Sequence, residues 1–550
     1  MSAAPQPKVS PVPSARRTSS SQNLSEKFSS RRSNELVIAF AGPIGCGIGP
    51  IIEETKILLA ARGYEDVVHV KLSDFLQNAL NEQTITLSES TENSRDSTRY
   101  KRYRRLQEAG KELRRKTTNR AILAEYAVQK IVLDRLKKSE VELGREGAND
   151  VIIPKRVAYL IDQVKRPEEV DLLRAVYRNL FYLIGVTRIK ERRVTELTSE
   201  GLRVDEIPGL MEIDRSEDKG DGQQLDKTLH LSDYFIRNDT VTVEDRNKKI
   251  DRVLALLHGD QSITPTDAEQ GMYAAYAAGL RSACLSRQVG ASIVSPSGEI
   301  LATGCNDVPR AGGGLYSASS PSSDMRCVHH QDQICFNDLH KRKLREEISN
   351  EVESYLGTLN REGSSFQLLP DEKEKLAEII YEKTRLGSLI EFSRSVHAEM
   401  DAIVSLARMG GGVIGATLFT TTFPCHSCAR HIVAAGISKV FYIEPYEKSM
   451  AKDLHYDAIA FEVEDSGTAG GTSKVKFLHF EGVSPRKFQN FFRAAGRKDS
   501  LGRFVKIHAR TADKVIPEYL DNYQDFEAKT VQHLEEELAS LKEQTSQLSD

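Results

Sequence analysis

The sequence predicts an α/β protein with two folded domains that follow one another along the chain. Its 550 residues are too many for one ordinary hydrophobic core. In the first half, continuous apolar runs of strand type alternate with helical patterns, which is typical of a parallel sheet covered by helices. The second half contains a helix, a β-hairpin and two short motifs rich in metal ligands. We expect a tail at 1–34, domains at 35–255 and 264–500, and a C-terminal extension at 501–550.

Composition restricts the class of protein. The chain carries 76 basic and 79 acidic residues, so its net charge of -3 gives no overall field that would attract a polyanion. Seven cysteines in so long a chain do not form a disulfide framework and suit a reducing cytosol. We find neither a membrane-helix run of about 20 apolar residues nor a secretory signal. We therefore expect a cytoplasmic protein with no membrane partner.

The tail at 1–34 is rich in Ser, Pro, Arg and Gln and poor in large apolar residues. Such a segment buries too little surface to offset the entropy lost on ordering. We expect it to be disordered; a transit peptide is the alternative.

The first domain opens with a buried strand at 36–40, a glycine-rich loop at 41–50 and an apolar-periodic helix from Ile51. Such a loop presents backbone N–H groups and a helix N-terminus to a phosphate. Two glycines match the spacing GxxxxGK[ST], but Ile48 and Gly49 replace the lysine and the hydroxyl residue of that motif. We expect nucleotide binding without efficient phosphoryl transfer. The candidate phosphate-binding residues are Gly42, Gly45, Gly47 and Gly49.

Two further apolar runs continue this pattern. The run at 157–162 ends in an acidic residue, like a Walker B strand, and another follows at 180–186. The segment 95–120 is dense in Arg and Lys with helical spacing; it is either a phosphate-contacting lid or a solvated charged helix. Over about residues 35–250 the chain resembles the P-loop kinase superfamily, especially the deoxynucleotide kinases. The resemblance implies a nucleotide sensor or a pseudo-kinase scaffold, and an active kinase is the alternative. Lys56, in the helix after the loop, is the candidate substitute for the missing lysine.

The second half contains a split motif with the chemistry of a zinc site. His397-Ala398-Glu399 is followed, after 24 intervening residues, by Pro424-Cys425-His426-Ser427-Cys428. One imidazole and two thiolates hold Zn²⁺ with three protein ligands and leave the fourth tetrahedral position for water. A carboxylate two residues after the histidine can reach that water without binding zinc, so Glu399 is the candidate acid/base. A structural zinc or a redox CxxC pair would leave this carboxylate and Pro424 without a role.

Further segments of this half carry a resemblance to a known family. They read RSxCxxRQVGAxIV from Arg281, GCND at 304–307, HAEMDAI from His397 and TTFPCHSCARHIVAAGI from Thr421. Together they resemble the deoxycytidylate deaminases over about 264–500. The resemblance implies a cytidine-deaminase-like α/β/α fold with a five-stranded mixed sheet.

The resemblance also implies roles for single residues. His397, Cys425 and Cys428 are the expected zinc ligands, and Glu399 is the expected acid/base. In the substrate half, Ala398 contacts the pyrimidine carbonyl through its backbone, Asn306 orients the substrate, and Arg287 belongs to the same loop region. Cys305 replaces the tyrosine that is usual in this family.

The two halves together resemble the bacterial anti-phage dCTP/dCMP deaminases. This resemblance implies conversion of dCTP or dCMP to dUTP or dUMP, depletion of the nucleotide pool during phage infection, restraint by a small inhibitory RNA, and a homo-oligomer, for which a hexamer is common among related deaminases. Two other functions remain open. One is a tRNA or single-stranded DNA deaminase, against which the balanced charge argues; the other is a kinase-like signalling or RNA-binding protein.

An insertion at 315–395 separates the hairpin from His397. It contains four clustered candidate ligands for a second, structural zinc: Cys327, His329, His330 and Cys335. The alternative is a substrate lid with incidental histidines. A charged helix is expected at 371–386. Near the C-terminus, an apolar stripe at three- and four-residue spacing from Val531 to Leu541 predicts a terminal helix docked on the protein.

Overall fold

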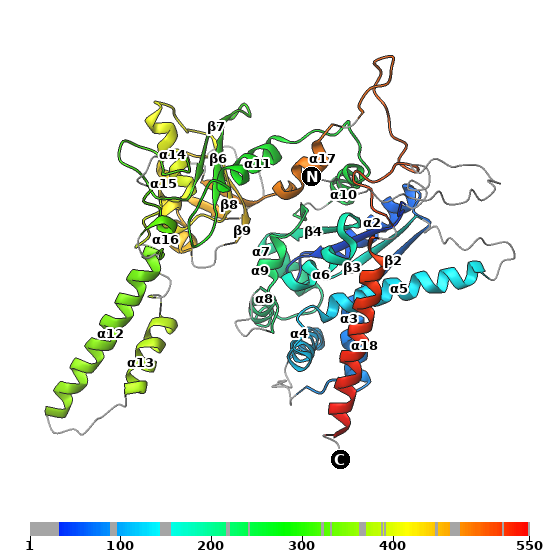
Figure 1. Cartoon of the computed structure of the whole chain (residues 1–550), viewed down its shortest axis with the longest axis horizontal. Helices are drawn as coiled ribbons and strands as arrows, with labels where there is room; N and C mark the ends of the chain where they lie inside the picture. The colour runs from blue at the N-terminus through cyan, green and yellow to red at the C-terminus, as the bar shows by residue number, and fades with distance from the viewer. Residues whose placement is uncertain are drawn as a thin grey trace, which may run out of the picture.

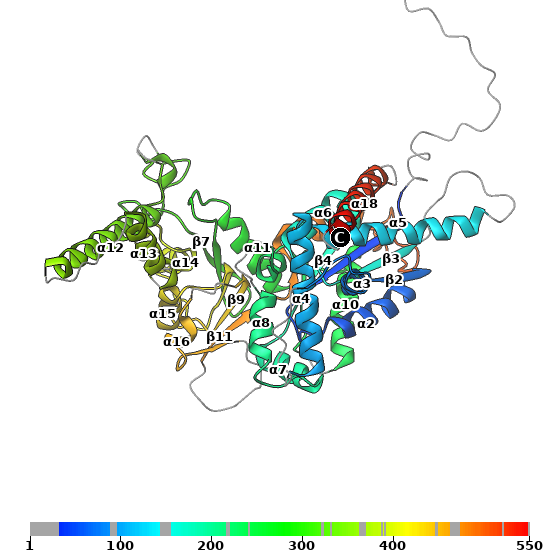
Figure 2. The same cartoon turned by 90° about the horizontal axis from the view of Figure 1, so that it is seen from below.

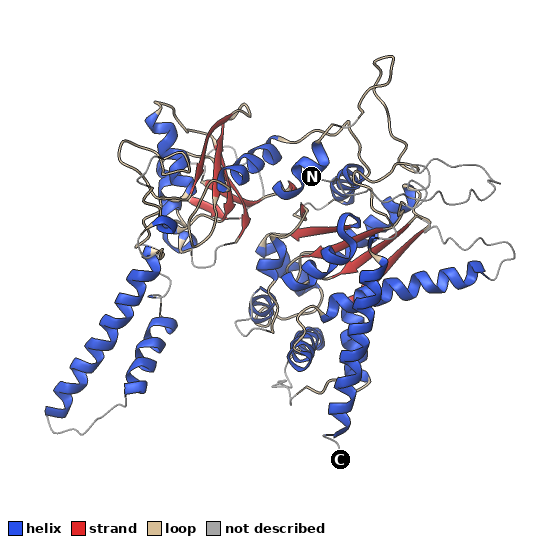
Figure 3. Cartoon of the chain, viewed as in Figure 1, coloured by secondary structure: helices blue, strands red, loops and turns tan. Residues whose placement is uncertain are grey.

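The structure is a computed structural model, and it describes residues 32–87, 96–143, 156–215, 221–239, 242–320, 324–330, 333–361, 370–384, 386, 389, 392–445, 449–461, 474–494, 496–519 and 522–547. The predicted tail at 1–34 therefore lies almost wholly outside the described residues. Two α/β units lie side by side, each built around one six-stranded sheet (Figure 1). Figure 3 shows both sheets with helices beside them.

The first sheet has the strand order β12-β5-β4-β1-β3-β2. Its strands are β1 (Leu36–Ala41), β2 (Asp66–Lys71), β3 (Val157–Asp162), β4 (Phe181–Thr187), β5 (Tyr234–Arg237) and β12 (Gly482–Val483). The first five are parallel, as the alternating pattern predicts, whereas β12 is antiparallel to β5. The kinase-like assignment of this unit stays a prediction, because a parallel sheet with a glycine-rich first loop is not specific to kinases.

Helices cover both faces of this sheet because the side chains of β1 alternate between two cores. Val37, Ala39 and Ala41 point into one core, and Leu36, Ile38 and Phe40 into the other. The first core contains α3 (Leu72–Asn81), α4 (Thr98–Thr117), α5 (Ile122–Leu143) and α6 (Pro167–Tyr177). The second contains α2 (Ile48–Ala61) and α10 (Val243–Leu257). Three helices lie near the sheet edge toward the second unit: α7 (Lys190–Ser199), α8 (Ile207–Arg215) and α9 (Leu225–Leu229).

The second sheet has the order β10-β11-β9-β8-β6-β7 and is mixed. The predicted hairpin is present as β6 (Gly290–Val294) and β7 (Ile300–Cys305), followed by β8 (Thr417–Thr422), β9 (Lys439–Glu444), β10 (Ile459–Phe461) and β11 (Val475–His479). The expected five strands are thus six, since β10 adds a parallel edge strand to β11. Its helices are α11 (Asp267–Gly279), α14 (Ala398–Arg408), α15 (His426–Ala434) and α16 (Ala451–Leu454). Helix α11 is capped by Thr266, whose side chain accepts the Glu269 N–H.

Ion pairs and one shared strand join the two units. After β11 the chain returns to the first sheet as β12, and α17 (Phe488–Phe492) follows. Arg252 on α10 pairs with the buried Glu269 on α11 at 2.7 Å. Glu269 Oε1 also accepts the backbone N–H of Val483 at 2.8 Å. The buried carboxylate of Glu269 therefore accepts hydrogen bonds from Arg252, from the Val483 N–H and from the N–H of Thr266, the cap residue of α11. Through these bonds it connects the two sheets.

The C-terminal helix α18 (Gln524–Gln547) packs on the first unit, as the apolar stripe predicts. Leu534 and Leu541 on it are buried, and Arg135 on α5 pairs with both Glu35 and Glu527. The insertion forms a helical hairpin of α12 (Phe336–Arg361) and α13 (Pro370–Lys383), which extends away from both sheets (Figure 1). Within the described ranges, every helix is too short or too polar to cross a bilayer.

Candidate zinc and substrate site

Two helix N-termini carry the predicted zinc ligands. His397 is the N-cap residue of α14 and Cys425 is the N-cap residue of α15, where its Sγ accepts the Cys428 N–H at 3.4 Å. Cys428 follows one turn later on the same helix. His397 Nδ1 lies 3.3 Å from Cys425 Sγ and 3.4 Å from Cys428 Sγ. The three residues, far apart in sequence, thus converge on one point at the end of the second sheet.

This donor set fits Zn²⁺. A tetrahedral zinc with bonds of about 2.3 Å to sulfur and about 2.0 Å to nitrogen separates such ligands by about 3.5 Å, close to the observed values. The pKa of Cys425 is lowered to about 4, chiefly by its hydrogen bond with Cys428, and this favours the thiolate that binds metal. The hydrogen bond with Cys425 raises the pKa of His397 to about 9. Three protein ligands at one point leave room for a fourth that is not protein.

Glu399 is buried beside these ligands. It lies in the first turn of α14, with its side chain only 4% exposed and its Oε2 3.5 Å from Cys428 Sγ. Burial raises the pKa of its carboxyl. Two residues after His397, it faces the same space as the sulfur ligands, as the motif predicts.

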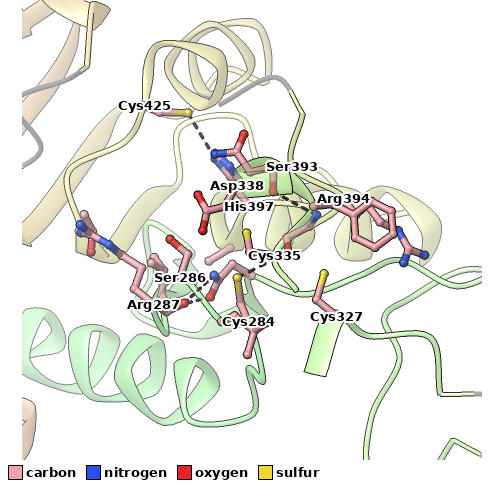
Figure 4. Close-up of a pocket in the computed structure, with 18 of the residues that line it drawn as sticks. Cys284, Ser286, Arg287, Cys327, Cys335, Asp338, Ser393, Arg394, His397 and Cys425 are labelled. Carbon is pink, nitrogen blue, oxygen red and sulfur yellow. Dashed lines mark hydrogen bonds between the residues drawn. The ribbon is translucent and has the colours of Figure 1, made fainter. Parts of the chain in front are cut away.

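A cavity of about 290 Å³ opens beside this cluster (Figure 4). His397, Ala398, Glu399 and Cys425 line its inner end. Its other walls come from the loop before β6, the start of α12 and the segment 393–395, together with Asn306, Cys327, Cys335, Thr422 and Phe423. A pocket of this size, with a few polar groups at one end, suits a small organic substrate.

Asn306 holds the loop that forms one wall of this cavity. Its Oδ1 accepts the Val289 N–H at 2.7 Å, and its Nδ2 donates to the Arg287 carbonyl at 2.8 Å. Asn306 is 7% exposed and lines the cavity, as does Ala398 at the start of α14. The structure therefore places both substrate-binding candidates at the cavity. It also shows that the Asn306 amide fixes the backbone of residues 287–289.

Arg287 lies at the outer part of the cavity and is half exposed. Its guanidinium is 3.4 Å from Glu444, which ends β9 and also accepts a hydrogen bond from Thr422 at 3.2 Å. Two further cations, Lys341 and Arg394, line the same cavity. The sequence motifs did not indicate these two cations, because both belong to the insertion. Only the positive charge of a segment that leads directly to His397 could have pointed to them.

In the part of the chain that the structure describes, the four candidate ligands of a second zinc do not lie together. Among the described residues, only His397, Cys425 and Cys428, and separately Glu125, His533 and Glu537, bring three potential ligand atoms together. Cys327 and Cys335 line the cavity beside His397 instead. His329 lies 3.6 Å from Asp324, and His330 packs edge-on against Phe336 at 5.0 Å. The arrangement favours the alternative of a cavity wall, and the second zinc stays a prediction without geometric support.

The glycine loop of the first unit connects β1 to α2. Gly45 and Gly47 have φ of 79° and 78°, so both positions require the left-handed backbone that glycine adopts readily. Gly42 packs against β4, where an added Cβ would lie 2.6 Å from the Val186 carbonyl oxygen, and Gly49 lies within α2. An internal ion pair serves the loop: Ile44 N–H donates to Asp214 Oδ2 at 2.7 Å, and Lys165 Nζ pairs with Asp214 Oδ1 at 2.5 Å. Lys56 pairs with Glu53 on its own helix at 2.7 Å, so this contact gives the substitute-lysine hypothesis no support.

Comparisons with known proteins agree with the geometry of the second unit. Residues 265–444 match the family model of the cytidine and deoxycytidylate deaminase zinc-binding region, and so the chain carries such a region. Over 175 residues the chain is 28% identical to the deoxycytidylate deaminase of Enterobacteria phage T4; the match covers 32% of this chain and 76% of that protein. The family match leaves residues 1–264 outside.

Two shorter matches have higher identity. The deoxycytidylate deaminase of Enterobacteria phage T2 is 44% identical over 54 residues, and ComE operon protein 2 of Bacillus subtilis (strain 168) is 40% identical over 55 residues. Each match covers 10% of this chain and 29% of the relative, so it spans less than a third of that protein. Among solved structures, the dCMP deaminase of cyanophage S-TIM5 in complex with dCMP and dUMP is similar at 20% identity, over 40% of this chain and 98% of that chain, with a TM-score of 0.22.

Proposed function

We propose that this chain is a zinc-dependent deaminase that converts deoxycytidine nucleotides, dCMP or dCTP, into the corresponding deoxyuridine nucleotides. The observation that carries the proposal is the convergence of His397, Cys425 and Cys428 with the buried carboxylate of Glu399 at the inner end of one cavity. The match to the deaminase zinc-binding region supports it.

The residues divide the chemistry between them. His397, Cys425 and Cys428 would hold Zn²⁺, which when bound supplies Lewis-acid activation of water. Glu399 takes a proton from the attacking water, delivers one to N3 of cytosine, and assists the departure of the C4 amino group as ammonia. In the net reaction, water replaces the C4 amino group of the cytosine base. The products are the deoxyuridine nucleotide and ammonia.

The remaining cavity residues position the substrate. The 287–289 loop, fixed by Asn306, and the backbone at Ala398 hold the pyrimidine against Glu399. Arg287, Lys341 and Arg394 supply positive charge for a 5′-phosphate. A nucleotide therefore suits the cavity better than a nucleoside does.

The finer parts of the proposal concern the biological role. The resemblance of the two halves to a degenerate P-loop domain joined to a deaminase supports dCTP as a substrate, depletion of the nucleotide pool against phage, and restraint by a small RNA. A homo-oligomer belongs to the same proposal.

The experiment is a substrate panel. Purified full-length protein is incubated with dCMP, dCTP, CMP, deoxycytidine and a cytosine-containing single strand, and uracil products are separated by chromatography. We expect product from dCMP or dCTP. In the variant Arg287→Ala, the KM for the nucleotide should rise while the slow turnover of deoxycytidine stays unchanged. Product on the single strand alone would make the chain a polynucleotide deaminase and overturn the proposal.

A further inference from the structure

A second cavity lies between the two units. Its volume is about 440 Å³, and both units line it. The first unit contributes Pro43 of the glycine loop, residues of α8 and α9, and four residues at and after the end of β4: Thr187, Arg188, Lys190 and Arg193. The second contributes Phe423, Tyr442, Pro445, Ser449, Lys452 and His479. Figures 1 and 2 both show α8 on the side of the first sheet that faces β9, and Figure 1 shows α9 beside it.

Positive charge dominates the wall of this interdomain cavity. Five cationic side chains and only two carboxylates line it. The cations are Arg188, Lys190, Arg193, Arg215 and Lys452, and the carboxylates are Glu212 and Asp226. Glu212 already pairs with Arg215 at 2.6 Å. Arg188 pairs with Glu196 at 3.1 Å, and Arg193 Nε donates to the Ile44 carbonyl at 2.9 Å. Over the ranges that the structure describes, no carboxylate pairs with Lys190, Arg193 or Lys452, so the positive charge of these three is not neutralised.

Two buried polar groups at the cavity also remain unused. Thr187 Oγ1 and Arg188 Nε are buried, and neither has a hydrogen-bond partner among the described residues. Thr187 is only 4% exposed. A buried donor without a partner is unfavourable for folding. Thr187 and Arg188 both line the cavity, so these two unpartnered groups belong to residues of its wall.

One backbone donor of the glycine loop is already engaged. The Ile44 N–H donates to Asp214 on α8. Asp214 is 2% exposed and pairs with Lys165. Helix α8 also lines the interdomain cavity through Pro208, Met211, Glu212 and Arg215, so this cavity lies directly beside the loop.

The rest of the wall suits a nucleobase. Phe423 and Tyr442 provide aromatic surface, and Met211, Leu225 and Leu229 provide aliphatic surface. Aromatic and aliphatic groups next to several cations match the two parts of a nucleotide, and the volume lies within the range for small-molecule pockets, about 300–1,000 Å³. We propose that the interdomain cavity binds a nucleoside polyphosphate that is not the substrate and that controls the deaminase site.

The route to the deaminase site is short. Phe423 lines both cavities. Ser449, which lines the interdomain cavity, donates its Oγ–H to the Pro424 carbonyl at 2.9 Å. Cys425, a candidate zinc ligand, is the next residue. A bound nucleotide that moves Phe423 or Ser449 therefore moves the backbone at Cys425, the candidate zinc ligand. This coupling rests on the proposed deaminase function.

Binding is tested on the full chain by titration calorimetry with ATP, GTP and inorganic tripolyphosphate. Lys190→Glu and Lys452→Glu reverse exposed charges on opposite walls, and Lys137→Glu on α5 is the matched control outside the cavity. We expect each cavity variant to bind ATP or GTP about tenfold more weakly and the control to bind as the wild type does. If no nucleotide binds, or if both cavity variants bind as tightly as the wild type, the proposal is wrong. Equal affinity for tripolyphosphate would overturn the nucleobase part.

Coupling is tested by dCMP turnover with and without the bound nucleotide. The wild type should change its rate at least threefold, and Ser449→Ala should bind the nucleotide but respond less. An unchanged wild-type rate would overturn the control function. If the protein deaminates no cytosine nucleotide at all, the proposed function fails, while the calorimetry still decides whether the site exists.

Discussion

Asn306→Ala should impair turnover through the loop that Asn306 holds. The amide makes two hydrogen bonds to backbone, at 2.7 Å to Val289 and at 2.8 Å to Arg287. Each such bond contributes about 1 kcal/mol net, so the loss of both favours a displaced loop by about 2 kcal/mol. If only the ordered loop binds substrate, kcat/KM falls by up to about 30-fold. Because Glu399 and the zinc ligands are untouched, zinc content should not change.

The assay compares steady-state dCMP deamination and zinc content in the wild type, Asn306→Ala and Asn337→Ala. Asn337 lines the same cavity, but its Oδ1 has no hydrogen-bond partner among the described residues, so its removal leaves the loop intact. A kcat/KM of Asn306→Ala within threefold of the wild type would refute the reasoning. So would an equal loss in both variants.

Three other changes give sharp outcomes. Cys425→Ala should lose both zinc and turnover, measured by metal analysis and product formation, and undiminished deamination would remove the zinc mechanism. Gly290→Ala should destabilise the second unit by about 3 kcal/mol or more, because the new Cβ would lie 1.8 Å from the Ala275 carbonyl oxygen; the control Gly49→Ala meets nothing within 4 Å, and equal melting temperatures would contradict the packing. Burial lowers the pKa of His258 to about 4, so the unfolded chain takes up a proton below about pH 6.5 that the folded chain does not. The free energy of unfolding should therefore fall by up to about 3 kcal/mol as the pH drops from 6.5 to 4, and urea titrations of His258→Gln should show a flatter profile; an identical pH slope would refute the assignment.

Local motifs predicted the cluster of His397, Cys425 and Cys428, because each motif places its residues within one helical turn. His397 and Glu399 share the start of α14, and Cys425 and Cys428 share the first turn of α15. The strand at 157–162 and a β-hairpin in the second half were equally predictable, since apolar runs and turn residues are local signals.

Long-range contacts were not predictable in this way. Asp214 reaches the glycine loop from 170 residues away, and no local pattern marks it as a partner of Ile44. Strand β12 joins a sheet whose other strands all precede residue 238, and two residues are too short a strand to recognise. The interdomain cavity combines loop ends of both units, so it exists only once the sheets have been placed.

The most direct test of the account measures zinc and turnover together in Glu399→Gln. The side chain is almost isosteric with glutamate and does not bind the metal, so we predict one zinc per chain and dCMP turnover reduced by at least about 100-fold. Loss of zinc from the variant, or turnover within tenfold of the wild type, would contradict the role of Glu399 as the proton carrier of this site.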